Sequence, residues 1–275
     1  MLTAAVAALA VTGVSHAANI TAKGSDTMLI LSQQWAEVYM KSHPGVNIAI
    51  TGGGSGTGIA ALLNGTTDIC SASWPMNSAQ VADFIKKFRR RPHEYKVCMD
   101  AVAVFVNKDN PVSQLSIPQL EKIFSGKITN WKQLGGRDAP ISLYGRENSS
   151  GTYEFFKVHV LNRQDFAATT KAMPGTAAVI EAVANDVNAV GFGGIAYGHG
   201  VKHLSISKTD GGDAVEPTRE NVYSDRYPIA RYLFNYLRAE NDSGAVGAYI
   251  AWCLSDEGQA VVSQAGYYPL PKNLR

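Results

Sequence analysis

Apolar residues recur along the chain with two alternating periods. Between Thr27 and Ser42 they return every three or four residues, as in a helix, whereas residues 46–50 alternate as a strand does. Strands that alternate with helices predict an α/β fold with a largely parallel sheet. Helices are expected at residues 56–63, 79–88, 117–124, 151–160, 175–184 and, as one long closing helix, 245–265. Strands or extended runs are expected at residues 19–23, 68–70, 95–107, 140–144, 189–192 and 227–237.

Three glycine- and hydroxyl-rich stretches lie where a predicted strand leads into a helix. They are residues 24–28 (Gly-Ser-Asp-Thr-Met), 52–58 (Gly-Gly-Gly-Ser-Gly-Thr-Gly) and 146–152 (Arg-Glu-Asn-Ser-Ser-Gly-Thr). A helix start offers unpaired N–H groups and a partial positive charge, and serine or threonine adds an O–H donor. Arg146 adds a guanidinium, and we favour a ligand role for it over a pairing with Glu147 or another surface acid. Together the stretches predict an oxyanion held mainly by neutral donors.

The first and third stretches are more than a hundred residues apart, yet both carry the same chemistry. Two α/β lobes facing each other across a cleft would bring them together. The extended run at 95–107 is a natural crossing between the lobes, and a return is expected near 221–228. We therefore expect residues 19–100 plus 225–275 to form lobe 1 and residues 101–224 to form lobe 2.

The first eighteen residues are small and apolar and end in Ser-His-Ala-Ala, which fits the cleavage site of a secretory signal peptide. Residues 1–18 are therefore predicted to be a leader, and the mature protein to be exported and soluble. The formal net charge of +2 gives no sign of a nucleic-acid partner. The basic run at 86–91 is best explained as a solvated helix end, with a docking patch as the alternative.

The spacing of candidate residues argues against nucleotide binding, nucleophilic catalysis and metal binding. Gly58 is followed by Ile59 rather than lysine, which argues against a nucleotide phosphate loop, and no nucleophile elbow surrounds Ser55. His199 and His203 have helical spacing, but glycines around them argue against a helix and a metal pair. No carboxylate pair or activated nucleophile is evident, so neither a catalytic residue nor a metal or other cofactor is predicted.

The chain has an odd number of cysteines, three in all: Cys70, Cys98 and Cys253. Cys70 and Cys98 fall on successive predicted strands, so a disulfide between them is one alternative. We favour three buried thiols that pack as small hydrophobic groups.

Several further segments complete a resemblance that spans nearly the whole mature chain. They are residues 123–131, 174–178, 190–197, 255–259 and 266–271. With the three anion stretches, they resemble the periplasmic phosphate-binding proteins of bacterial ABC transporters. The resemblance implies a type II periplasmic-binding fold, with two α/β lobes closing on one phosphate ion. It also implies a monomeric periplasmic receptor that delivers phosphate to a membrane permease and is not an enzyme.

The resemblance also implies roles for individual residues. Thr27 and the backbone N–H of Met28 would bind phosphate from the first stretch, and Ser55 would cap the second helix and donate its hydroxyl. The complete set of phosphate-binding residues that it implies is Ser25, Thr27, Met28, Ser55, Ser73, Arg146, Ser150, Gly151 and Thr152.

Ser73 and Trp74 depart from the pattern of the resembled family. Well-known members have a carboxylate at the position of Ser73, where it accepts the proton that phosphate retains and so excludes sulfate. Others have serine there followed by arginine, and here Trp74 follows. Asp26 or Asp68 could supply the acceptor, although Asp26 could equally cap its helix. A receptor for sulfate or another tetrahedral oxyanion is therefore the alternative, with a phosphate-ester hydrolase and an adhesion or signalling role behind it.

Overall fold

The computed structural model describes residues 18–275; the predicted leader falls on residues 1–17, outside this part, and on Ala18. The strands are β1 (Ala18–Gly24), β2 (Val46–Thr51), β3 (Ile69–Ala72), β4 (His93–Val106), β5 (Gln114–Ser116), β6 (Ser142–Arg146), β7 (Lys171–Met173), β8 (Ala189–Gly194), β9 (Lys202–His203), β10 (Ser205–Ser207) and β11 (Ala230–Leu237). The α-helices are α1 (Leu29–Ser42), α2 (Ser55–Asn64), α3 (Ser78–Phe88), α4 (Ile117–Phe124), α5 (Gly151–His159), α6 (Thr176–Asn185), α7 (Arg219–Tyr223), α8 (Gly244–Leu254) and α9 (Asp256–Gln264). The 3-10 helices are η1 (Asp26–Met28), η2 (Trp131–Leu134), η3 (Ile195–Tyr197), η4 (Ala239–Asn241) and η5 (Lys272–Leu274).

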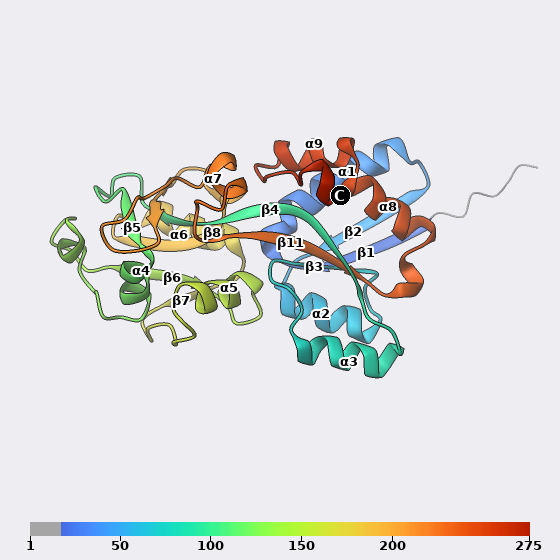
Figure 1. The fold of residues 1–275 in the computed structure, drawn as a ribbon, viewed down its shortest axis with the longest axis horizontal. Helices are drawn as coiled ribbons and strands as arrows, with labels where there is room; N and C mark the ends of the chain where they lie inside the picture. Colours follow the sequence, from blue (N-terminus) through green and yellow to red (C-terminus); the bar gives the residue numbers. More distant parts are fainter. Residues whose placement is uncertain (1–17) are drawn as a thin grey trace, which may run out of the picture.

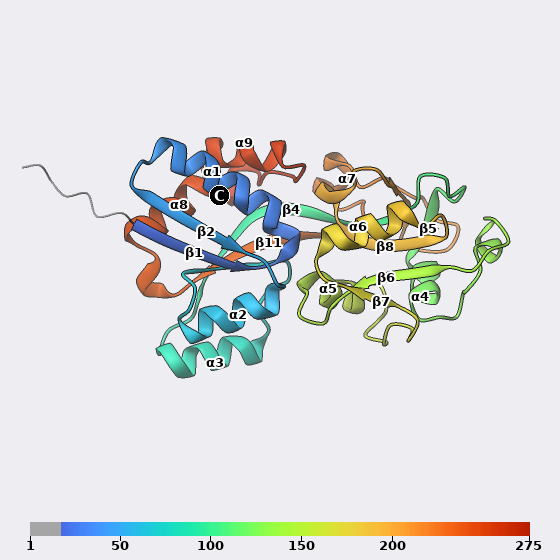
Figure 2. The same ribbon diagram turned by 180° about the vertical axis from the view of Figure 1, so that it is seen from behind.

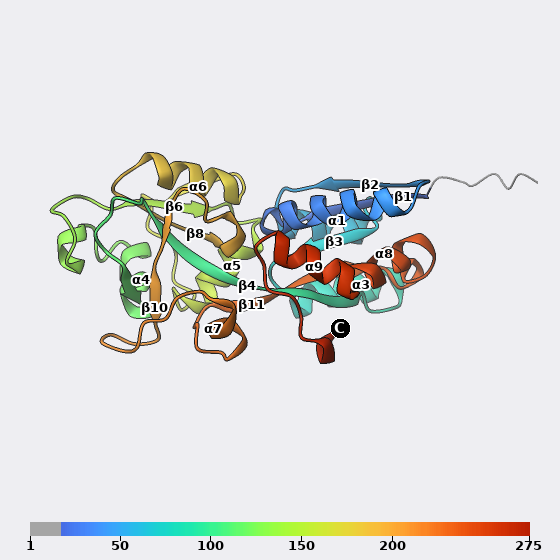
Figure 3. The same cartoon turned by 90° about the horizontal axis from the view of Figure 1, so that it is seen from above.

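The elements form two α/β lobes, joined by strands that run from one lobe into the other (Figure 1). The first lobe contains β1–β3 with α2 and α3 on one side and α1, α8 and α9 on the other (Figures 1 and 2). The second lobe contains β5–β10 with α4–α7, and α6 and α7 lie on opposite sides of it (Figure 3). The predicted two-lobe α/β fold is confirmed.

One continuous sheet links the lobes in the order β2-β1-β3-β11-β4-β8-β6-β7. The outer pairs are parallel, as the alternation of strands and helices predicts. At the centre, β11 pairs antiparallel with both β3 and β4, and β4 pairs antiparallel with β8. Both β4 and β11 therefore contribute residues where the lobes meet (Figure 3).

The expected long closing helix is wrong, because two helices meet at Ser255. This residue ends α8 in an extended conformation, and its Oγ accepts a hydrogen bond from the Gly258 N–H (3.2 Å) at the start of α9. Serine followed by two acidic residues is a strong start signal for a new helix. The break lets α9 pack on α1, where the Trp35 indole N–H donates to the Gly258 carbonyl (2.7 Å).

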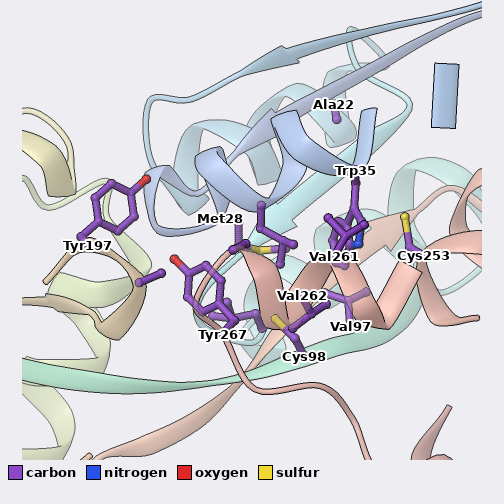
Figure 4. Packing of buried hydrophobic residues seen from close by; sticks show 14 of the residues in the cluster. Ala22, Met28, Trp35, Val97, Cys98, Tyr197, Cys253, Val261, Val262 and Tyr267 are labelled. Atoms are coloured by element: carbon purple, nitrogen blue, oxygen red, sulfur yellow. The ribbon is translucent and has the colours of Figure 1, made fainter. Parts of the chain in front are cut away.

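The core of the first lobe joins the two ends of the chain. Figure 4 shows Met28 and Trp35 from the N-terminal part packed beside Val262 and Tyr267 from the C-terminal part. In the second lobe, buried aromatic rings fill the core, and Phe156 stacks on Phe192 with ring centroids 3.9 Å apart. These cores fix the helix starts of the anion stretches in place.

The three cysteines are free, buried thiols, as favoured. The alternative of a Cys70–Cys98 disulfide rested on successive strands lying side by side. Instead β11 is inserted between β3 and β4, where Cys70 is opposite Tyr236 and Cys98 is opposite Leu233. Burial raises the pKa of all three thiols above the ordinary range, which keeps them protonated.

The structure also places the basic run and one of the paired histidines. Lys86 and Lys87 lie exposed in the last turn of α3, where cations complement the helix dipole. His203 lies on the short strand β9 rather than on a helix, and residues 18–275 contain no cluster of three metal-ligating side chains. None of the helices in that part of the chain is long and apolar enough to span a membrane.

Candidate functional site

Side chains from all three anion stretches meet in one place. The Oγ1 atoms of Thr27 in η1 and Thr152 in α5 lie 2.8 Å apart. Ser73 Oγ lies 3.4 Å from Thr152 Oγ1 and 3.3 Å from Ser55 Oγ. We call Thr27, Ser55, Ser73 and Thr152 the hydroxyl cluster. All four residues are almost fully buried, so their O–H groups are concentrated where the two lobes touch.

Close backbone approach allows the two lobes to meet here. The Gly56 N–H of α2 donates to the Ser149 carbonyl just before α5 (2.9 Å). Gly54 has a φ of 93°, and a Cβ there would lie 2.6 Å from the Ser149 oxygen. A Cβ on Gly151 would lie 2.5 Å from Ser55 Oγ. Glycine at these positions lets the positive ends of α2 and α5 converge on the cluster.

The structure corrects the cap expected at Ser55. Gly54 occupies the N-cap position, and its positive φ turns the chain into α2. Ser55 Oγ instead accepts the backbone N–H of Ser73 (3.0 Å), which leaves its proton available to an acceptor. Ser150 is a true cap of α5, because its Oγ accepts the N–H groups of Thr152 and Tyr153 (3.2 and 3.3 Å).

The remaining residues of the first stretch surround Thr27. The Met28 N–H donates to the Ser25 carbonyl (3.1 Å), and the Met28 side chain points into the core (Figure 4). Ser25 Oγ is buried and has no partner within residues 18–275. The Tyr267 hydroxyl donates to the Thr27 carbonyl, and the Tyr197 hydroxyl of the second lobe donates to the Asp26 carbonyl (2.5 Å). Two tyrosines therefore fix this turn from outside.

Arg146 joins the third stretch to the first rather than pairing with Glu147. It ends β6 almost fully buried, and its Nη2 donates to Asp26 Oδ2 (2.6 Å) and its Nη1 to Thr176 Oγ1 (2.8 Å). The Arg146 Nε–H is buried without a partner among the described residues, so the guanidinium retains donor capacity. Burial lowers the pKa of Arg146, and the adjacent Asp26 carboxylate opposes that shift.

Of the two candidate acceptors, Asp26 lies at the site and Asp68 does not. Asp26 Oδ1 accepts the Gly53 N–H (2.7 Å) while Oδ2 receives Arg146, so Asp26 joins the first, second and third stretches rather than capping its own helix. Asp68 instead binds the backbone and hydroxyl of Thr21, within the first lobe.

Asp100 and Arg231 form a buried ion pair that sequence reasoning missed. They face each other in the register of β4 and β11, and Arg231 donates to Asp100 Oδ2 from Nε (3.0 Å) and Nη2 (2.8 Å). Arg231 Nη2 also donates to Thr152 Oγ1 (2.9 Å). Burial raises the pKa of Asp100, and the Arg231 guanidinium opposes part of that rise. The available signal was Asp100 within the apolar run at residues 97–106 and Arg231 within the largely apolar strand β11.

A cavity of about 420 Å³ borders the cluster between the lobes. Its lining includes Ser55, Trp74, Ser149, Ser150, Gly151 and Arg163. Trp74 packs edge-on against Phe155 and His159, so the residue after Ser73 contributes an aromatic wall and no charge.

A buried set of donors shared by two lobes is typical of solute-binding proteins, which hold a ligand between their lobes. The family model described as PBP superfamily domain matches residues 10–257. Over 269 residues the chain is 35% identical to the phosphate-binding protein PstS of Pseudomonas aeruginosa, covering 92% of this chain and 83% of the relative. The PstS protein of Staphylococcus epidermidis is 31% identical, with 91% and 78% covered.

Solved structures agree with this similarity. A phosphate ABC transporter substrate-binding protein with bound phosphate from Clostridium perfringens is 29% identical, with a TM-score of 0.84 over 92% of this chain and 100% of that one. An ABC-type phosphate transport receptor from Vibrio cholerae is also 29% identical, with a TM-score of 0.73 over 92% of this chain and 100% of that one. The chain therefore belongs to the PBP superfamily, and within it to the PstS-like phosphate-binding proteins.

Proposed function

We propose that the chain captures inorganic phosphate between its two lobes and delivers it to the membrane permease of an ABC transporter. The observation that carries the proposal is the 2.8 Å approach of Thr27 and Thr152, hydroxyl residues from opposite lobes that meet beside the buried guanidinium of Arg231. Such a place concentrates O–H and N–H donors and two helix starts, which is what a small oxyanion requires. The relatives named above support phosphate as that anion.

In this proposal the anion-binding residues are Ser25, Thr27, Met28, Ser55, Ser73, Arg146, Ser150, Gly151 and Thr152. The Met28 N–H would exchange the Ser25 carbonyl for the anion. The hydroxyls of Thr27, Ser55, Ser73 and Thr152 would turn their protons from one another toward the anion. Arg146 would add charge from a guanidinium already oriented by Asp26 and Thr176. We keep residues 19–100 plus 225–275 as lobe 1 and residues 101–224 as lobe 2.

Closure of the lobes would couple binding to recognition by the permease. Contacts such as Gly56 to Ser149 and Arg146 to Asp26 join the lobes, so they form only in the closed arrangement. An anion that binds donors from both sides stabilises that arrangement over an open one. We further propose that the protein works as an exported, periplasmic monomer, and that it binds phosphate without turnover.

Titration calorimetry on protein freed of bound ligand tests the proposal. We expect saturable binding of one phosphate per chain, together with a more compact form in small-angle scattering. Absence of binding would refute the proposal. Hydrolysis of a chromogenic phosphate ester would instead favour an enzyme.

Sulfate remains the second candidate because Ser73 holds the position at which a carboxylate would exclude it. A serine hydroxyl can accept the proton of phosphate but can equally donate to sulfate. Asp26 is the carboxylate at the site that can restore the preference, since a carboxylate repels an anion without a proton. Competition between the two anions across pH separates a phosphate receptor from a general oxyanion receptor.

A further inference from the structure

We infer that Arg231 is a second cation of the anion site and acts on the ligand through Thr152. Asp100 then determines how much of the positive charge of Arg231 acts on the ligand. The inference rests on the proposed function of oxyanion capture. Arg231 lies on β11, outside the three anion stretches, and it is a positioning residue rather than a direct donor.

The direction of one hydrogen bond gives Arg231 its effect. Its Nη2–H donates to Thr152 Oγ1 (2.9 Å), which occupies a lone pair of that oxygen. Thr152 has one hydroxyl proton, and this proton is left to an acceptor other than Arg231. A hydroxyl that receives a charged N–H is polarised and becomes a stronger donor in its turn. Thr152 therefore carries part of the guanidinium charge toward the anion.

Arg231 also holds both sides of the site at once. Its Nη1 donates to the Ser73 carbonyl (2.9 Å) in the first lobe, while Nη2 reaches Thr152 in the second. The guanidinium lies 5.2 Å from the centre of the Phe155 ring, the same ring on which Trp74 packs. Since Trp74 brings no charge, Arg231 supplies the second positive charge on this side of the cluster.

Asp100 balances that charge from the side of β4. It is completely buried and accepts from Arg231 and from the Ile195 N–H (3.1 Å). A buried carboxylate this close to the cluster opposes the binding of an anion, while it stabilises the arginine that favours it. Replacing the acid and replacing the pair should therefore change the affinity in opposite directions, which a merely structural role would not do.

The test compares three variants by phosphate calorimetry. Asp100→Asn keeps the shape and an acceptor for Arg231 but removes the negative charge, and we expect binding about 3- to 10-fold tighter than wild type. The double variant Asp100→Asn with Arg231→Met removes both charges, so neither is left buried alone, and we expect about 10- to 100-fold weaker binding. Its affinity should also depend less on added sodium chloride than that of the wild type.

Arg238→Met is the matched control. Arg238 follows β11 and pairs with Glu240 (2.9 Å) away from the cluster, so its loss should leave affinity unchanged. A folded double variant that binds as wild type does would overturn the inference, and so would Asp100→Asn that binds more weakly. If the double variant does not fold, the sign of the Asp100→Asn effect decides alone. A wild type that binds no oxyanion would overturn the proposed function as well, so the two failures are distinguishable.

Discussion

Replacing Arg146 by methionine is the most direct test of how charge is arranged at the site. Methionine keeps much of the apolar stem but removes the guanidinium, which is almost fully buried and donates to Asp26 and Thr176. Two losses follow from this change. The anion loses a charged donor, and Asp26 becomes a carboxylate at the site whose remaining described partner is the Gly53 N–H.

A hydrogen bond to a charged group contributes about 1.5–3 kcal/mol, and bonds made by one guanidinium do not add fully. We therefore expect phosphate affinity to fall by about 2–4 kcal/mol, or roughly 30- to 1000-fold in Kd. The part due to Asp26 should be recovered when Asp26→Asn is added, because an amide does not repel the anion. The double variant should bind more tightly than Arg146→Met alone.

Titration calorimetry of the wild type, both single variants and the double variant measures these terms as a double-mutant cycle. Thermal unfolding without phosphate shows whether each variant folds. Unchanged affinity in a folded Arg146→Met variant would remove Arg146 from the site. A double variant that binds no better than Arg146→Met would refute the repulsion assigned to Asp26.

Three further predictions test selectivity, packing and pH dependence. Asp26→Asn should reduce the preference for phosphate over sulfate in competition calorimetry, and an unchanged preference would rule out Asp26 as the acceptor. Trp35→Phe should lower the free energy of unfolding in urea by about 1–3 kcal/mol, because it leaves the Gly258 carbonyl without its indole partner. The hydrogen bond from the Tyr95 hydroxyl lowers the pKa of Asp242 below its ordinary 3.8. The Asp242 carboxylate therefore stabilises the fold fully above pH 3.8, and this stabilisation is lost as the pH falls through the lower pKa of the folded state. Asp242→Asn should thus destabilise the protein more at about pH 6 than at about pH 2.

Local signals in the sequence were sufficient for the two-lobe fold and for the meeting of the three anion stretches. Periodicity identified most helices, because a face buried against the sheet imposes its spacing. It failed at Ser255, where apolar residues on both sides continue a helical pattern and only the cap residue marks the break. The cap of α2 at Ser55, which the resemblance implied, was also wrong, since whether Gly54 or Ser55 turns the chain depends on backbone approach from the other lobe.

The buried pair of Asp100 and Arg231 could not be predicted because it depends on which strands are neighbours. The two residues are 131 positions apart, and the pattern of each strand says nothing about its partner. A charge within an apolar run indicates that a partner exists, but only the antiparallel pairing of β11 with β4 identifies it. The ligand roles of the nine candidate residues stay predictions.

The placement of β11 between β3 and β4 has a consequence for the order of folding. The second lobe is nearly contiguous in the chain, so its helices and strands are all present once residue 224 has been made. The first lobe lacks its central strand β11, and the helix that covers Trp35, until residues 230–264 are added. During synthesis from the N-terminus, residues 18–88 therefore remain an incomplete sheet with an open edge at β3. The lobe whose synthesis begins first is thus the lobe that is completed last.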